Sequence, residues 1–334
     1  MPRKGRSVFS ELVVAYLFLG GAGAGACAVM AVAGLLVDGD QLRLCAASRF
    51  LDERARAYGR FFGTGLTAGV AVLVLGMICL AADAGRPDRL VLLAVSKPTN
   101  YLVLGAWSLS ACFGLGVLAV LAWRGILPVT LAAFRVLGVL LAVVSFVTMA
   151  YTGLLLSSMA SVPLWHSLWL PVMFVLSSLS CGIALVLASA ILGRSACAFA
   201  SVLRMLVRID GLIIVVEVLV LAAWLVAVCA AAGAGSADAN ATSTDAAALA
   251  SVRLLLAGPD ALAFWVGLVA VGLVVPLAID VIASCALSSP PASLATLSGQ
   301  TAFLASATGV LVGGACLRAT IVSAALVPAA VSLL

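Results

Sequence analysis

Charged residues are scarce in this sequence, at 9% of 334 positions, whereas hydrophobic residues make up 65%. Such a chain has too little polar surface to cover a water-soluble globule. The 18 Lys and Arg residues form no single basic patch, because they lie in short connections between apolar runs, and this spacing argues against a nucleic-acid binder. The composition therefore predicts that lipid is the main solvent of the protein.

Metal-binding side chains are also few. Histidine occurs once, as His166, so this chain cannot hold a haem between two intramembrane imidazoles. The nine cysteines are scattered singly with no C-x-x-C pair, which disfavours iron–sulfur or zinc ligation. Buried cysteine in the role of a small apolar residue explains them better. We expect no haem and no metal in this chain.

Long apolar runs, by contrast, are abundant. Eight of them can cross a hydrocarbon layer of roughly 30 Å at about 1.5 Å per residue. They lack the period-two alternation of membrane strands, so helices are required. We predict an all-α integral membrane protein with eight transmembrane helices in two four-helix bundles, and one membrane domain over residues 1–334. The predicted helices are 12–37, 61–82, 101–123, 128–156, 168–193, 211–233, 261–287 and 301–327.

The connection at residues 41–58 mixes apolar side chains with arginines and acids. A short helix lying on the membrane surface would have this composition. A solvated loop would have it equally well, and the sequence leaves both interpretations open.

An even number of spans puts both termini on one side of the membrane, called face A here, with face B opposite. Seven Lys and Arg residues lie in the connections of face A and nine in those of face B. The positive-inside rule favours face B as the cytoplasmic side by this small margin.

Polar and aromatic residues from five separate stretches converge on face A. The span count puts Tyr16, Asp83, Trp107 and Tyr151 at this end of the bundle. Aromatic residues often form an ordinary belt at the membrane interface. However, hydroxyls, a carboxylate and flat rings around an apolar interior are also what a quinone head group needs, because its carbonyl oxygens accept hydrogen bonds and its reduction takes up protons. Other residues of this group are Glu11, Arg86, Lys97, Asn100, Trp165 and His166.

At these positions the sequence resembles the NrfD/PsrC family, the membrane subunits of polysulfide, nitrite and thiosulfate reductase-type complexes. Each matching motif alone is short, but their order and spacing cover essentially the whole chain. The motifs are YLFLGG at 16–21, DAGRPDR at 83–89, KPT at 97–99, GAW at 105–107, YTGLL at 151–155, VPLW at 162–165, RID at 208–210 with Glu217, FW at 264–265 with Pro276, and GG at 313–314 with Arg318.

The resemblance implies a membrane anchor subunit without a redox centre of its own. Such a subunit docks on a four-cluster iron–sulfur protein, which serves a molybdopterin or multihaem catalytic subunit. Electrons pass between menaquinone, bound near face A as substrate, and the nearest cluster. Tyr151 falls where the family has a tyrosine that hydrogen-bonds the quinone, and Tyr16 falls where some members have histidine. The family also puts face A outside the cytoplasm of a prokaryotic cell, with both termini on that side.

Several residues of face A have two interpretations. Arg86, Arg89 and Lys97 either anchor the headgroup interface or dock the partner subunit. Asp83 is either a solvated helix end or a proton relay for the quinone. Gly21 and Gly25 form a G-x-x-x-G step, which we interpret as a helix-packing contact rather than a ligand site.

Ionisable residues inside the spans are the other informative group, since a lone charge at mid-bilayer costs about 2.5 to 3.5 kcal/mol. Arg135, Glu217 and Asp280 are each predicted about two helical turns from face B, at depths that would allow pairing. They form either structural ion pairs or part of a proton-transfer route. Arg318 lies nearer face A, where Glu11 is the partner we expect for it.

Two other function classes remain open. A secondary transporter would use the intramembrane charges and Pro276 as substrate or ion ligands, and it would show inverted repeats and broken helices in both halves. We find no such repeat in the sequence. A purely structural anchor would have the same spans and no quinone site. The resemblance favours the quinone-binding subunit over both.

Overall fold

The computed structural model describes residues 11–47, 53–84, 101–159, 165, 167–235, 252–286 and 297–331. Within these ranges the chain forms helices and no strands. Eight of the helices are long and apolar enough to cross a membrane. The prediction of an all-α protein with eight transmembrane helices is therefore confirmed.

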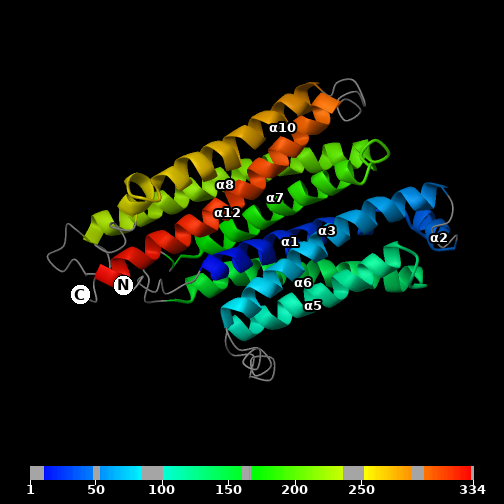
Figure 1. The fold of residues 1–334 in the computed structure, drawn as a ribbon, viewed down its shortest axis with the longest axis horizontal. Coiled ribbons are helices and arrows are strands. Elements are labelled where there is room, and N and C mark those ends of the chain that lie inside the picture. Colours follow the sequence, from blue (N-terminus) through cyan, green and yellow to red (C-terminus); the bar gives the residue numbers. More distant parts are fainter. Residues whose placement is uncertain are drawn as a thin grey trace, which may run out of the picture.

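The helices run roughly along the long axis of the molecule and form two neighbouring groups (Figure 1). The first group contains α1 (Glu11–Leu35), α3 (Glu53–Ala84), α5 (Tyr101–Trp123) and α6 (Leu131–Ser157). The second contains α7 (Trp169–Leu192), α8 (Ala200–Gly235), α12 (Leu297–Val331), and a continuous pair of segments, η1 (Ala263–Val274) and α10 (Val275–Ala286). Contacts of α7 with both α1 and α6 hold the two groups together.

Glycines allow the two groups to approach closely. A Cβ atom on Gly25 of α1 would overlap the Ser178 carbonyl oxygen of α7, and one on Gly182 of α7 would overlap the backbone of Gly25. Only hydrogen fits at these two points, so backbone packs directly on backbone. The predicted packing role of the G-x-x-x-G step is confirmed at Gly25, which lies at the seam between the two groups.

The connection after α1 folds as helix. Residues Gly39–Ala47 form α2, and α3 begins at Glu53, well before the predicted start near residue 61. The helical interpretation of this region is confirmed for α2, while residues 53–60 extend a transmembrane helix out of its apolar run. A run of apolar residues marks where a helix can lie in lipid, but not where its hydrogen bonding stops.

One span departs from α-helical geometry. The segment η1 is a π-helix of 12 residues that ends just before Pro276. Proline lacks an N–H donor and disrupts the normal i to i−4 pattern on its N-terminal side. Gly272 in this segment lies against Gly313 of α12, so that a Cβ atom on either residue would overlap the other backbone.

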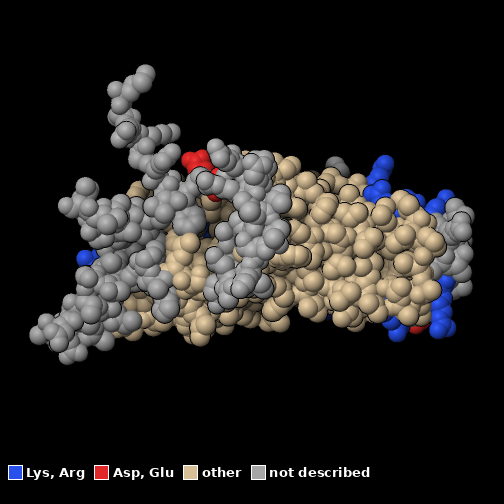
Figure 2. Space-filling model, turned by 90° about the horizontal axis from the view of Figure 1, so that it is seen from below, with Lys and Arg blue, Asp and Glu red and all other residues tan. Residues whose placement is uncertain are grey.

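Most arginines of the described residues gather at the face B end, where α2 lies. Figure 2 shows a cluster of blue atoms at one end, next to a long stretch of surface without charged side chains. This end carries Arg43, Arg54, Arg56, Arg60, Arg124, Arg135, Arg194, Arg204 and Arg208.

Candidate functional site

Two tyrosines meet near the face A end of the first helix group. Tyr16 lies in the second turn of α1, and Tyr151 lies near the end of α6. Each residue is only 4% exposed, and the two hydroxyls lie within reach of a hydrogen bond with each other. A buried hydroxyl needs such a partner, because leaving it unpaired costs about 1 to 3 kcal/mol.

Gly105 of α5 makes room for the Tyr151 ring. A Cβ atom on Gly105 would overlap the aromatic ring of Tyr151. The next turn of α5 also faces inward, since the buried Ser108 donates a hydrogen bond to the Gly105 carbonyl oxygen over 3.0 Å. The position of Tyr151 therefore depends on a residue without a side chain on a neighbouring helix.

Asp83 completes a group of three polar side chains. It lies in the last turn of α3, is exposed, and is close enough to Tyr16 for an electrostatic interaction. The three helices α1, α3 and α6 thus place one accessible carboxylate beside two enclosed hydroxyls. A hydroxyl pair next to a carboxylate can donate hydrogen bonds and can exchange protons with the membrane surface.

Trp107 does not join this group, although the sequence suggested that it would. Its side chain is 57% exposed. Two residues along a helix correspond to a rotation of about 200°, so Trp107 faces away from the side of α5 on which Gly105 meets Tyr151. Its predicted place beside the hydroxyl pair is wrong for this reason.

Other face A predictions lie elsewhere. Arg86, Arg89 and Lys97, the predicted docking residues, are outside the described residues, as is His166. Trp165 is fully buried, and its indole nitrogen donates to the Ile321 carbonyl oxygen of α12 over 3.0 Å. The tryptophan therefore packs against the second helix group.

A second polar group lies inside the bilayer span, centred on Arg318 of α12. The guanidinium is fully buried and donates to Ser178 Oγ over 2.7 Å, to the Gly314 carbonyl oxygen over 2.9 Å and to Ser177 Oγ over 3.3 Å. The rings of Phe18 and Phe174 lie 5.8 and 5.2 Å from it. Cation–π contacts of this kind help to offset the loss of water around a buried cation.

Ser177 links Arg318 to an acidic residue. The Ser177 hydroxyl accepts a hydrogen bond from Arg318 and also lies close enough to the Glu217 carboxyl of α8 to interact with it. Arg318 and Glu217 attract each other but form no direct ion pair within 4.0 Å. The expected pairing of Arg318 with Glu11 is wrong, because Glu11 is exposed at the start of α1 while Arg318 is enclosed.

Two more buried carboxyls continue this polar group towards face B. Asp210 lies seven residues before Glu217 on α8, so both are on one side of that helix. The β-carbon of Asp280 on α10 approaches Gly211 of α8. Ser180 of α7 faces Asp210, yet Asp210 Oδ1, Asp280 Oδ2 and Ser180 Oγ have no hydrogen-bond partner among the described residues. Buried polar atoms without partners are rare and often mark functional sites.

Arg135 belongs to neither polar group. It lies in the second turn of α6, is exposed, and its guanidinium lies beside Gly39 of α2. The helix begins at Leu131 after a Thr130 cap, which puts Arg135 nearer to face B than predicted. Its predicted proximity to Glu217 and Asp280 is therefore wrong.

Asp210, Ser177, Ser178 and Ser180 were not predicted as site residues. The predicted helix began at residue 211, which put Asp210 outside the membrane, whereas α8 begins at Ala200. The seven-residue spacing to Glu217 was the available signal. The serines were hidden within an apolar run, and their role depends on which helix faces them.

The fold and these two groups define a multi-pass helical membrane protein with polar groups at one end and within the span. The chain matches a known family, described as "Polysulphide reductase, NrfD", over residues 2–330. It belongs to this family, whose members are membrane subunits of quinone-interacting oxidoreductase complexes. Such subunits generally partner with iron–sulfur and catalytic subunits. No curated protein matches the chain.

Proposed function

We propose that this chain is the quinone-binding anchor of a respiratory oxidoreductase. It passes electrons between menaquinone and a four-cluster iron–sulfur subunit, which is joined to a molybdopterin or multihaem catalytic subunit. The observation that carries the proposal is the buried, interacting pair of Tyr16 and Tyr151 beside Asp83 at one end of the span. Family membership supports the same assignment.

The three side chains suit a quinone head group in chemical terms. Interconversion of quinone and quinol moves two electrons and two protons. The Tyr151 hydroxyl donates a hydrogen bond to a quinone carbonyl oxygen, and Tyr16 orients that hydroxyl. Asp83, the exposed member of the group, exchanges the protons with face A. The iron–sulfur partner receives or supplies the electrons.

The orientation proposed here puts face A and both termini outside the cytoplasm of a prokaryotic inner membrane. Most of the described arginines gather at face B (Figure 2), and the positive-inside rule associates such an end with the cytoplasm. A docking surface for the iron–sulfur subunit then lies on the outer side, where Arg86, Arg89 and Lys97 are the candidate contacts.

The test compares quinol oxidation by assembled complexes that carry Tyr151→Phe, Asp83→Asn or Tyr58→Phe. Loss of the Tyr151 hydroxyl should slow oxidation about tenfold, since one hydrogen bond is worth roughly 0.5 to 1.5 kcal/mol. Loss of the carboxylate should slow it about a hundredfold or more, the range for a lost proton-transfer group. Tyr58 lies at face B, where the same change should leave the rate unchanged. Unchanged rates in all three variants would favour a purely structural anchor.

We propose a second role, proton transfer across part of the span, for the polar group of α7, α8, α10 and α12. Glu217, Asp210 and Asp280 form a row from the Arg318 level towards face B, and two of these carboxyls have an atom without a hydrogen-bond partner among the described residues. Glu217→Gln and Asp280→Asn should lower the number of protons moved per quinol while the complex still assembles. Normal proton stoichiometry in both would leave only the structural interpretation, that of a buried polar network.

The rival secondary transporter is less well supported. It requires broken helices at matching positions in both halves, whereas the described π-helical segment, η1, lies in the second group and the spans of the first group are α-helical. Purification of the chain without iron–sulfur partners, together with solute uptake in vesicles, would favour the transporter.

A further inference from the structure

Three arginines surround one pocket at the face B end of the first helix group. Arg56 and Arg60 come from the first two turns of α3, and Arg124 follows the last residue of α5. The pocket is open to the surface and has a volume of about 420 Å³. Its remaining lining residues are Gly59, Thr64, Trp123 and Ile126.

The positive charge of this pocket is not neutralised by the described part of the chain. The ion pair within 4.0 Å among the described residues joins Arg43 to Asp40, away from the pocket. None of the described residues that line the pocket is acidic. Arg56 and Arg60 are four residues apart on one helix, a spacing at which like charges repel each other. An anion between the three guanidiniums would remove this repulsion.

Arg124, directly after α5, is held in place by contacts with α3. Arg124 donates a hydrogen bond from Nη2 to Thr67 Oγ1 on α3 over 3.2 Å. Its side chain runs over Gly63, where a Cβ atom would lie 3.5 Å from Arg124 Cγ. A guanidinium that is already oriented loses less side-chain entropy when it binds an oxyanion, so this arrangement favours binding.

The other side of the pocket is apolar. The Trp123 ring is buried in a stack on Phe62, whereas Ile126 is exposed. Both residues line the same pocket as the arginines. A ligand that fits must therefore carry a negative group beside a hydrocarbon portion. This combination is the chemistry of an anionic phospholipid, and basic pockets between helices at a membrane surface bind such headgroups.

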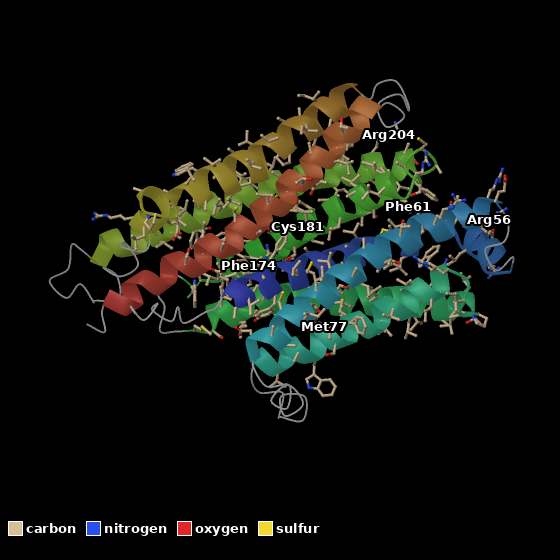
Figure 3. All side chains as sticks on the ribbon, in the orientation of Figure 1. Arg56, Phe61, Met77, Phe174, Cys181 and Arg204 are labelled. Atoms are coloured by element: carbon tan, nitrogen blue, oxygen red, sulfur yellow. The ribbon has the colours of Figure 1, made fainter. Side chains whose placement is uncertain are left out.

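We propose that Arg56, Arg60 and Arg124 form a binding site for the phosphate group of an anionic phospholipid. The site lies at the opposite end of the molecule from Tyr16 and Tyr151 and does not depend on the proposed quinone chemistry. Figure 3 labels Arg56 at this end, beside α2. The bound lipid would bridge α3 and α5 at the membrane surface.

The test titrates the purified full chain with dioleoyl phosphatidylglycerol and counts bound lipids by native mass spectrometry. The triple variant Arg56→Gln, Arg60→Gln, Arg124→Gln should bind about a hundredfold more weakly, as expected for three lost contacts near a membrane surface. The matched control is Arg43→Gln, Arg204→Gln, Arg208→Gln, which removes the same charge from face B outside this pocket. The control should retain affinity within about tenfold, because screened distant charges contribute little.

Two further binding experiments identify the source of the phosphate group. Dioleoyl phosphatidylcholine should not bind detectably better to the native chain than to the triple variant. Inorganic phosphate at millimolar concentration should not displace phosphatidylglycerol; displacement would assign the site to free phosphate instead of lipid. If the triple variant and the control lost phosphatidylglycerol affinity equally, the proposed site would be overturned. If the triple variant misfolds, Arg56→Gln with Arg60→Gln tests the same proposal and leaves the bond from Arg124 to Thr67 intact.

Discussion

The two helix groups differ in where their ionisable side chains lie along the span. In the first group, ionisable residues lie at the ends, and its middle contains neutral pairs such as Cys112 and Ser145, whose Sγ and Oγ atoms are 3.3 Å apart. In the second group, Arg318, Glu217 and Asp280 lie well inside the span, all buried. Neutral side chains in the middle of a span cost little free energy in lipid. Buried charges cost several kcal/mol and are usually retained for a function.

This contrast suggests that the two helix groups have different roles in the subunit. The first group brings Tyr16, Tyr151 and Asp83 together near face A, with the carboxylate exposed and the two hydroxyls enclosed. The second group has a row of ionisable side chains running from the Arg318 level towards face B. Gly25 packs on Gly182 at the seam, where the backbones of the two groups are in direct contact.

The largest effect is expected from Arg318→Met. Removing one partner of a buried charge network typically costs about 3 to 5 kcal/mol, because the remaining charge stays buried without compensation. The variant should lose this much unfolding free energy in a denaturant titration of the detergent-solubilised chain. Adding Glu217→Gln to Arg318→Met should recover part of the loss. The surface control Arg208→Met should change stability by less than about 0.5 kcal/mol.

This comparison decides whether the second group depends on its buried charges. If Arg318→Met were as stable as the native chain, the two groups would not differ in the way described. The network of Ser177, Ser178 and Glu217 would then be a by-product of packing.

A smaller effect is expected from Gly105→Ala, which tests the first group. The new Cβ atom would displace the Tyr151 ring, at a cost of about 1 to 3 kcal/mol for overpacking. The matched control is Gly114→Ala on the same helix, where a Cβ atom would meet nothing within 4 Å. Alanine there should be neutral or stabilising by up to about 1 kcal/mol, because it favours the helix over glycine.

The readouts are thermal unfolding and quinol oxidation in the assembled complex. Gly105→Ala should lower the oxidation rate as well as the stability, whereas Gly114→Ala should leave the rate unchanged. A rate that survives the displacement of Tyr151 would separate this tyrosine from the chemistry.

The sequence predicted most of the fold because the physical constraint is simple. A run of about 20 apolar residues must cross the bilayer as a helix, so all eight spans could be located. The same count put Tyr16, Asp83 and Tyr151 at one end, and the structure places these three together. Helix ends were harder to predict, because hydrogen bonding continues through the polar residues before Gly211 and stops at Thr130 before α6. Both errors affected the site, by hiding Asp210 and by misplacing Arg135.

The rotation of a helix about its axis could not be predicted at all for α5. This helix is apolar on every side, so no hydrophobic stripe distinguishes a face that packs inward from one that faces lipid. Trp107 was grouped with Tyr151 on the basis of depth alone. The packing of Gly105 on Tyr151 fixes the rotation, and only the three-dimensional structure contains that contact.

The smallest effect is therefore expected from Trp107→Leu. The side chain is more than half exposed and faces away from the Tyr151 contact, so its replacement should change stability by less than about 0.5 kcal/mol. Quinol oxidation in the assembled complex should remain at the native rate. A marked loss of rate would mean that the quinone approaches α5 from its lipid-facing side. The site would then have to be extended around that helix, and the first group would bind its substrate on its outer surface as well as at its rim.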